Sequence, residues 1–327
     1  MKKLKIACCW LAEVMGAKNS CPSYEQVHYF DTLKRMGHDV KIIPIQPMED
    51  MDSVLIDSIE MWKPDILFVK FYRTEIRKET IKYISDNTDT ITVGLFGDDE
   101  KVFKRSKLKL GKGETTYSAE VAPSFNWVVT TYKPAVKWYK KLGIKNVFHS
   151  HYGANHWAYK KLKLKKIFDV SFCGARKSER SSFLNRLAAS GIKLHVFGNG
   201  WDGDKSVLDQ SDYSALFCRS KININIGVDL WDGKKVLQIK GRDWEVPMSG
   251  GFLMNHYNPL MEENFKQGGQ GKEIGVYKNT DDLVKKIKYY LAHDKEREKI
   301  ALAGYRRARK DHTYKKRFER ILDIVKH

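Results

Sequence analysis

The sequence contains no run of about 18 apolar residues, which is the length that a helix needs to cross a bilayer, so we expect no transmembrane helix. The first ten residues, MKKLKIACCW, lack a long apolar core and a small-residue cleavage site. They therefore predict a first β-strand and not a signal peptide. Both absences favour a cytoplasmic protein.

Cysteine is scarce, and its spacing suggests no cross-link. The five cysteines are odd in number, include no CxxC pair, and mostly lie in apolar strand or helix patterns: Cys8, Cys9, Cys21, Cys173 and Cys218. We expect buried thiols in a reducing compartment.

Acidic residues are scarce in one region of a chain whose net charge is +19. Residues 1–100 carry 13 basic and 17 acidic side chains, residues 101–150 carry 11 and 2, and residues 151–327 carry 35 and 21. The basic residues gather in three clusters, at 101–112, 159–166 and 305–320. These clusters fit a solvated lysine-rich surface, or an anionic partner such as nucleic acid, acidic lipid headgroups or a phosphorylated substrate.

Short apolar strands alternate with helical patterns twice along the chain, once over residues 1–150 and again from residue 168. This alternation predicts βαβ units and two open α/β sheets in tandem. A chain of 327 residues suits two domains. We expect domains at 1–155 and 156–310, and a last helix at 311–327 whose apolar spacing suits packing back on the first domain. Ligands of such sheets bind outside the carboxyl ends of the strands, and the cleft between two domains is the expected site.

The stretch FCGARKSERSSF (172–183) combines a strand end, a helix start and several cations. Helix N-termini attract anions, and basic side chains add charge-assisted hydrogen bonds. We interpret Gly174, Arg176, Lys177 and Arg180 as a diphosphate site, with an ordinary basic surface turn as the alternative.

The stretch GNGWDG (198–203) fits the G-x-G-x-x-G fingerprint of dinucleotide-binding proteins. However, a polar, turn-like segment follows it, and no acid ends a strand about 20 residues later. A loop that approaches a ligand through the backbone of Gly200 is the better interpretation, and a nicotinamide oxidoreductase remains a rival.

Asp98, Asp99 and Glu100 lie together at the carboxyl end of a predicted strand. Their mutual repulsion can raise the pKa of one carboxylate toward that of a general base, and we select Asp98 or Asp99. A solvated loop or an acid-rich helix start is the alternative. Cations that follow directly predict a surface for a polyanionic acceptor: Lys101, Lys104, Arg105, Lys107 and Lys109.

Three histidines, His149, His151 and His156, lie at the predicted domain junction. Their spacing does not indicate a zinc site, because no cysteine or carboxylate is adjacent. We predict no metal site, and interpret a histidine there as a hydrogen-bond donor or base.

The stretch RDWEVPMSGGFLMNHY (242–257), with the helical sequence that follows it, resembles the C-terminal domain of the CgeB-type, group 1-like glycosyltransferases. The resemblance covers about residues 168–325, and in the first domain it is only architectural. It implies the GT-B fold, in which two Rossmann-like domains with parallel sheets face each other across a cleft. It also implies a nucleotide diphosphate sugar, most simply a UDP-sugar, bound mainly by the second domain, with no tightly bound cofactor.

The resemblance implies roles for particular residues. Glu245 would bond the ribose hydroxyls of the donor, with Arg242 nearby. A helix beyond Gly250 and Gly251 would approach the phosphates, and Asn255 and His256 would face the sugar or the distal phosphate.

The sequence also departs from the family. Many relatives have a second glutamate eight residues before the first, where this chain has Leu237, with Gln238 and Lys240 close by. The stereochemical outcome is therefore open, and an inverting route would use Asp98 or Asp99 as its base.

The acceptor has several candidates. Hydroxymethylated DNA bases fit the basic run, because phage DNA glucosyltransferases share the fold and use an aspartate of the first domain. Lipid or cell-wall precursors, with peripheral membrane contact, compete with DNA. The rival of another class is a non-catalytic GT-B-like module that binds nucleic acid.

Overall fold

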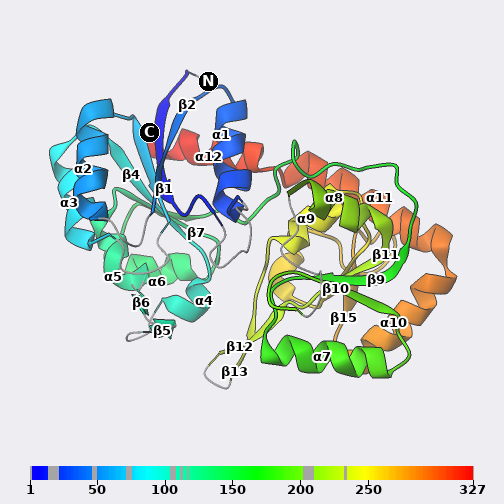
Figure 1. Cartoon of the computed structure of the whole chain (residues 1–327). Helices are drawn as coiled ribbons and strands as arrows, with labels where there is room; N and C mark the ends of the chain where they lie inside the picture. The colour runs from blue at the N-terminus through cyan, green and yellow to red at the C-terminus, as the bar shows by residue number, and fades with distance from the viewer. Residues whose placement is uncertain are drawn as a thin grey trace. The chain divides into compact units, whose positions relative to one another are not determined.

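The protein folds as two compact units, each with its own parallel sheet (Figure 1). The first holds Pro22–His151 with the described parts of Met1–Val14 and Arg317–His327, and the second is formed by Tyr152–Lys316. The computed structural model describes residues 2–13, 22–45, 50–70, 76–103, 108–110, 113–115, 118–201, 210–231 and 234–326. The predicted fold class of two α/β units with parallel sheets is confirmed.

Six parallel strands form the sheet of the first unit, in the order β2-β1-β3-β4-β7-β8. They are β1 (Lys5–Trp10), β2 (Asp39–Pro44), β3 (Ile66–Val69), β4 (Ile91–Phe96), β7 (Trp127–Thr130) and β8 (Val147–His149). The helices are α1 (Asp31–Arg35) after a π-helical turn at Gln26–Phe30, α2 (Met51–Trp62), α3 (Lys78–Asn87), α4 (Asp99–Val102), α5 (Ser118–Val121), a 3₁₀ turn at Ala122–Ser124, and α6 (Ala135–Lys141). A two-stranded hairpin, β5 (Leu108–Leu110) and β6 (Gly113–Thr115), lies within the predicted basic loop.

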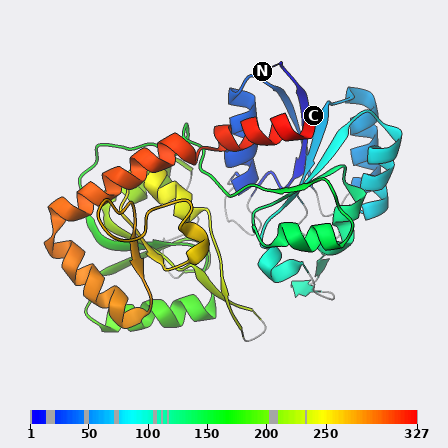
Figure 2. The same cartoon turned by 180° about the vertical axis from the view of Figure 1, so that it is seen from behind.

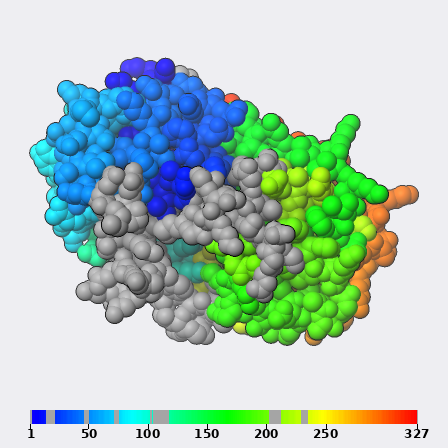
Figure 3. All heavy atoms as spheres, in the orientation of Figure 1, coloured from blue at the N-terminus to red at the C-terminus, as the bar shows by residue number. Residues whose placement is uncertain are grey.

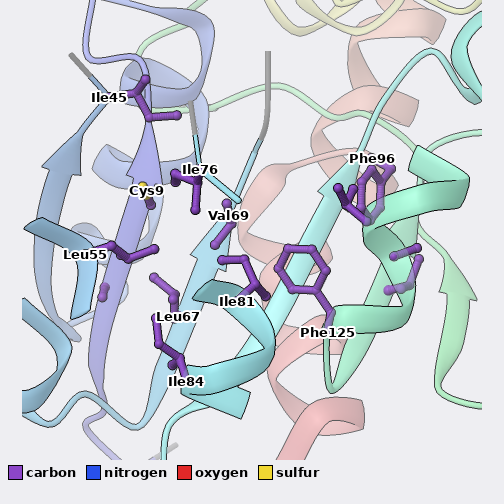
Figure 4. Close-up of a cluster of buried hydrophobic side chains, with 14 of the residues drawn as sticks. Cys9, Ile45, Leu55, Leu67, Val69, Ile76, Ile81, Ile84, Phe96 and Phe125 are labelled. Atoms are coloured by element: carbon purple, nitrogen blue, oxygen red, sulfur yellow. The ribbon is translucent and has the colours of Figure 1, made fainter. Parts of the chain in front are cut away.

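Apolar side chains from the central strands and the covering helices fill the core of this unit. Figure 4 shows part of that cluster, with Leu67 and Val69 of β3 close to Ile81 and Ile84 of α3. A strand buried on both faces reads as a continuous apolar run, which is why β3 has the sequence ILFV.

The last helix, α12 (Tyr314–Lys326), packs on other buried side chains of the first unit over the residues that belong to that unit. The ring of Phe318 is buried, and its centroid lies 5.6 Å from that of Tyr29 and 5.7 Å from that of Phe68. The C-terminal residues are therefore part of the same compact unit as the N-terminal strand (Figure 2).

Five parallel strands form the sheet of the second unit, in the order β10-β9-β11-β14-β15. They are β9 (Phe168–Cys173), β10 (Leu194–Phe197), β11 (Ser220–Asn225), β14 (Leu253–His256) and β15 (Gly275–Tyr277). The helices are α7 (Ser178–Ala189), α8 (Gln210–Arg219), α9 (Arg242–Met248), α10 (Thr280–Ala292) and α11 (Asp294–Asp311), with a 3₁₀ turn at Pro259–Met261. A hairpin of β12 (Val228–Trp231) and β13 (Lys234–Leu237) extends from the sheet edge, which the sequence did not predict.

Predicted helix starts are confirmed where the capping chemistry is explicit. The hydroxyl of Ser23 accepts a hydrogen bond from the Gln26 amide at 3.0 Å. The side-chain oxygen of Asn279 accepts one from the Asp282 amide at 2.9 Å and caps α10. Both bonds satisfy amides that the first helical turn leaves without intrahelical partners.

The order of the second sheet reverses at β9, because β10 lies on one side of that strand and β11 on the other. Open α/β sheets bind ligands at such a switch point, outside the carboxyl ends of the strands. The loops after β9 and β11 are therefore where a site is expected.

Four of the five cysteines are buried free thiols, as predicted: Cys8, Cys9, Cys173 and Cys218. Cys21 lies outside the described residues. Within the part of the chain that the structure describes, no helix is both long enough and apolar enough to cross a membrane.

Candidate functional site

The loops that follow β9 and β10 are joined through their backbones. The amide of Gly174 donates to the carbonyl of Phe197 at 2.9 Å, and the amide of Arg176 donates to that of Asn199 at 2.8 Å. Gly198 makes this approach possible, because a Cβ there would lie 2.5 Å from the Gly174 carbonyl oxygen and its φ is +121°. Only glycine fits that position without strain.

Two cations project from this loop just before α7. Arg176 and Lys177 are exposed, and the Arg176 guanidinium lies 5.9 Å from the centre of the Trp201 ring. Trp201 is itself fixed, since its indole N–H donates to the Gly174 carbonyl at 2.7 Å. The segment around α7, drawn in green, forms part of the visible surface of the second unit in Figure 3. Exposed cations beside a helix N-terminus suit a diphosphate.

Arg180 has a structural contact as well. Its Nη1 donates to the Ala175 carbonyl at 2.9 Å, so it braces the loop that carries Arg176 and Lys177. Gly200 has a φ of +81°, and a Cβ there would lie 3.3 Å from the Cβ of Arg176. Three of the residues predicted for phosphate binding thus lie in one loop cluster with Gly200, and Arg180 bonds to the backbone of that cluster.

Glu245 and Arg242 form a buried ion pair on the first turn of α9. Arg242 Nη1 lies 3.3 Å from Glu245 Oε2, and the Glu245 side chain is only 1% exposed, against 25% for Arg242. The guanidinium also lies 5.3 Å from the centre of the Tyr213 ring. Burial raises the pKa of the neighbouring Cys173 thiol, which therefore stays neutral. Because Glu245 is buried, a ribose can reach it only if the side chains around it move apart.

Asp243, which the sequence analysis missed, connects three elements below this edge of the sheet. Its Oδ1 accepts hydrogen bonds from the amides of Asn225 (2.9 Å, β11) and Asn255 (2.6 Å, β14), and its Oδ2 accepts one from the Lys240 backbone (2.6 Å). Burial raises the pKa of Asp243 to about 7, although these hydrogen bonds oppose the rise. The sequence did contain a signal for Asp243, since asparagines end two strands of the predicted sheet and this acid lies two residues before Glu245.

Asn255 is 2% exposed and belongs to the network of Asp243, so its amide faces the protein and not a ligand. His256, at the carboxyl end of β14, is only partly buried, and its ring lies edge-on to Tyr277 with centroids 5.4 Å apart. Burial lowers the pKa of His256, which favours a neutral ring at neutral pH. Of these two residues, His256 is the one placed to meet a ligand.

The expectation for Gly250 and Gly251 is wrong. The helix α9 ends before them and β14 begins at Leu253, so no helix starts beyond the pair. They lie at the amino end of a parallel strand, which is the edge of the sheet opposite to Gly174. Their role is steric, because a Cβ on Gly251 would lie 2.9 Å from the Asn223 amide nitrogen and one on Gly250 would lie 2.8 Å from the Lys161 side chain.

In the first unit, the two candidate bases differ sharply. Asp99 is 1% exposed, and its carboxylate accepts hydrogen bonds from the hydroxyls of Thr130 and Tyr139, the latter at 2.8 Å. Burial raises the pKa of Asp99, while these bonds lower it. Asp98 is only partly buried and holds a left-handed backbone with φ 60°. Such strain in a residue other than glycine is frequent at functional sites, so Asp98 is the better candidate.

The predicted polyanion surface lies mostly outside the described residues. Lys104, Arg105 and Lys107 are not described, and of Lys109 only the backbone is, within β5. Lys101 is buried, on α4, and so does not form an exposed surface.

The histidines do not form a metal site within the described residues, where no group of three histidine, cysteine or acidic side chains is close enough to hold an ion. The rings of His149 and His151 lie 4.0 Å apart, and that of His156 lies 3.9 Å from Trp157. Burial lowers the pKa of His149 to about 4, so its ring is neutral at physiological pH.

A protein-family model described as "Glycosyl transferase-like" matches residues 176–323, which include most of the second unit. The match begins at Arg176 and includes α9 with Arg242, Asp243 and Glu245. The prediction of a glycosyltransferase is confirmed at this level. None of the curated proteins matches the chain in sequence.

Solved structures share the fold over almost the whole chain. Alr3699/HepE from Anabaena in complex with UDP-glucose aligns with a TM-score of 0.63 and 10% identity, covering 99% of both chains. Sucrose-phosphate synthase from Thermosynechococcus elongatus aligns with a TM-score of 0.63 and 9% identity, over 99% of this chain and 98% of the other. The DNA modifying enzyme β-glucosyltransferase aligns with a TM-score of 0.61 and 14% identity, over 99% of this chain and 100% of the other. The fold of the chain is therefore the GT-B fold of glycosyltransferases.

Proposed function

We propose that the protein transfers a sugar from a uridine diphosphate sugar, bound by its second unit, to a hydroxyl group of an anionic acceptor. The observation that carries this proposal is the site at the switch point of the second sheet, where exposed Arg176 and Lys177 precede α7 inside the region of the family match. One structural neighbour, Alr3699/HepE, supports the choice of donor, since its complexes contain UDP-glucose or UDP with glucose.

Each group at the site has a role in this proposal. Arg176 and Lys177 bind the diphosphate, together with backbone amides at the start of α7. Glu245 accepts hydrogen bonds from the ribose hydroxyls once the nucleotide enters, and Arg242 pairs with that carboxylate and orients it. His256 faces the sugar or the distal phosphate from the end of β14.

The transfer needs one base and a stabilised leaving group. Asp98 removes the proton of the acceptor hydroxyl as its oxygen attacks the anomeric carbon. The bond from that carbon to the diphosphate oxygen breaks, and the electron pair leaves with UDP. Arg176 and Lys177 stabilise the charge that develops on the departing phosphate. A single displacement inverts the anomeric carbon, which agrees with Leu237 at the position where many relatives have a second glutamate.

The acceptor and the subgroup are part of the proposal. The basic run that follows Asp98 favours an anionic acceptor, either DNA with hydroxymethylated bases or a lipid or cell-wall precursor. The DNA alternative has a structural neighbour that modifies DNA, and that likeness is one of fold. The motif at 242–257 favours the CgeB-type subgroup.

The test is sugar transfer from radiolabelled UDP-sugars, with hydroxymethylated DNA and polyprenyl-phosphate-linked precursors as separate acceptors. We expect UDP release coupled to labelling of one acceptor by the wild type, and its loss in Asp98→Asn. A protein that binds DNA yet neither binds nor turns over any sugar nucleotide would be a binding module, and the proposal would be wrong.

A further inference from the structure

A basic and apolar surface lies on the second unit, away from the carboxyl edge of its sheet. It consists of the segment 160–167, with sequence KKLKLKKI, and the neighbouring face of α11. Two interactions bring the segment and the helix together: Lys161 Nζ lies 5.7 Å from the Tyr305 ring centre, and Glu298 acts electrostatically on Lys166. Just before the segment, the His156 carbonyl accepts a hydrogen bond from Arg309 Nη1 at 3.1 Å. Figure 1 and Figure 2 both show the segment running alongside α11.

The backbone of this segment is fixed by α8, which leaves its side chains to project outward. The amide of Lys160 donates to the Ser214 hydroxyl at 3.2 Å, and that of Leu162 donates to the Cys218 sulfur at 3.3 Å. The ammonium of Lys166 donates to the Ser220 carbonyl at 3.0 Å, so this lysine anchors the segment. The surface is therefore built in advance and needs little ordering when a partner binds.

The outward side chains alternate between charge and hydrocarbon. Four lysines are exposed, and among the described residues none of them has an acidic partner: Lys160, Lys161, Lys163 and Lys165. Between and beside them, Leu162 is 38% exposed, Ile167 is 52% exposed, and Leu302 of α11 is 36% exposed. Arg306, Arg309 and Lys310 add exposed cations from the last turns of α11.

We propose that this surface docks the protein on an anionic lipid bilayer. The cations attract acidic headgroups, and the exposed leucine and isoleucine side chains enter the boundary between headgroups and acyl chains. Long lysine side chains suit this geometry, because their hydrocarbon stems lie against apolar surface while the ammonium groups reach the phosphates. The interleaved aliphatic side chains favour lipid over nucleic acid, where they would gain nothing from a phosphate backbone. This inference concerns a surface outside the donor site, so it stands or fails separately from the sugar transfer.

The experiment is co-sedimentation of the full chain with vesicles of phosphatidylcholine alone and of phosphatidylcholine with about one third phosphatidylglycerol. Two quadruple variants are compared: Lys160→Gln, Lys161→Gln, Lys163→Gln, Lys165→Gln, and a matched control in the first unit, Lys137→Gln, Lys140→Gln, Lys141→Gln, Lys145→Gln. The control lysines are also exposed and lie beside Leu142, which is 48% exposed. Both variants lose the same charge, so only position differs.

We expect the wild type to bind the anionic vesicles, and the first variant to bind about a hundredfold or more weakly, since each basic residue near such a surface contributes roughly fivefold. The control variant should keep most of the binding. A double variant, Leu162→Ser with Ile167→Ser, should lose the part of the binding that survives high salt.

Equal loss in the two quadruple variants would assign the binding to net charge and overturn the proposal. Binding to a DNA duplex in preference to the anionic vesicles, or no vesicle binding at all, would overturn it too. UDP binding, measured on the same variants, reports separately on the donor site.

Discussion

Buried acidic side chains at the carboxyl edges of the two sheets have different interaction partners. In the second unit, Glu245 is paired with a cation, and Asp243 accepts hydrogen bonds from β11, from β14 and from the Lys240 backbone just before its own helix. In the first unit, Asp99 is held by the neutral hydroxyls of Thr130 and Tyr139, and its neighbour Asp98 carries backbone strain. The second edge is thus organised to hold a charged site in place, whereas the first combines one anchored acid with one strained acid.

This difference between the two units agrees with the region that the protein-family model matches. The family match covers residues 176–323 and therefore the unit with the organised edge, while the first unit shares only the fold of its neighbours. A nucleotide is the same in every reaction of a given donor, so its site needs fixed charges. Acceptors differ, and the first unit is free to vary. The following predictions test that contrast.

The largest effect is expected at the strained acid. Asp98→Asn keeps the size of the side chain and removes its basicity, so kcat should fall by about 10² to 10⁴ with little change in donor affinity. Steady-state kinetics with a sugar nucleotide measure both. Asp98→Gly should also lose activity but unfold at higher denaturant, because glycine relieves the positive φ. Full activity in Asp98→Asn would remove Asp98 from the mechanism.

The next effect is expected at the ion pair. Glu245→Leu leaves the Arg242 guanidinium without its partner and should lower the free energy of unfolding by about 3–5 kcal/mol. The double variant Arg242→Met with Glu245→Leu should recover much of that loss, without recovering nucleotide binding. Urea unfolding followed by circular dichroism gives the values. Asp281→Leu, at an exposed acid of α10 in the same unit, is the control and should change stability little. Equal effects at Glu245 and Asp281 would show that the pair is not structurally important.

A smaller effect is expected at two glycines of the loop after β10, which is joined to the loop that carries Arg176 and Lys177. Gly198→Ala would place a Cβ against the Gly174 carbonyl, whereas Gly200→Ala meets only the Arg176 side chain. Both positions have positive φ and share that strain, so Gly198→Ala should cost about 1–3 kcal/mol more than Gly200→Ala. Thermal unfolding of the pair of variants measures the difference. Similar melting temperatures would mean that the two loops are not held as closely as the structure has them.

The smallest effect concerns pH. Because the pKa of Asp243 is raised to about 7 in the folded state, the fold retains a proton that the unfolded chain has lost above about pH 4. This contribution to stability is present at low pH and is lost as the pH rises toward 7, with a slope of at most about 1.4 kcal/mol per pH unit. Asp243→Asn should flatten that slope between about pH 4 and 7. Unfolding at several pH values checks it, and an unchanged slope in the variant would assign the titration to another group.

Much of the fold could be predicted from the sequence. Buried parallel strands such as ININ and helix caps such as Ser23 and Asn279 have local signals, and those elements formed where expected. The chemistry of the loop after β9 also has a local signal, since a strand end, a glycine and cations lie within five residues of one another.

Features that depend on contacts distant in sequence could not be predicted. The sequence around Asp99 does not indicate that the hydroxyls of Thr130 and Tyr139 will donate hydrogen bonds to its carboxylate. The misplacement of Gly250 and Gly251 has a similar origin, because only the strand direction shows that they lie at the far edge of the sheet. Asp243 was missed although asparagines end two of the predicted strands, because only the folded sheet shows that Asn225 and Asn255 both bond to it.

The central claim is that the second unit binds a nucleoside diphosphate at Arg176, Lys177 and Glu245. Isothermal titration of the wild type with UDP, GDP, ADP, CMP and NAD tests it most directly, with Glu245→Gln, Arg176→Ala and the control Glu298→Gln alongside. The account predicts that UDP binds, that each site variant loses roughly tenfold or more in affinity, as expected for one charge-assisted hydrogen bond, and that the control is unchanged. Binding of NAD in place of UDP, or UDP affinity that is the same in all four proteins, would contradict it.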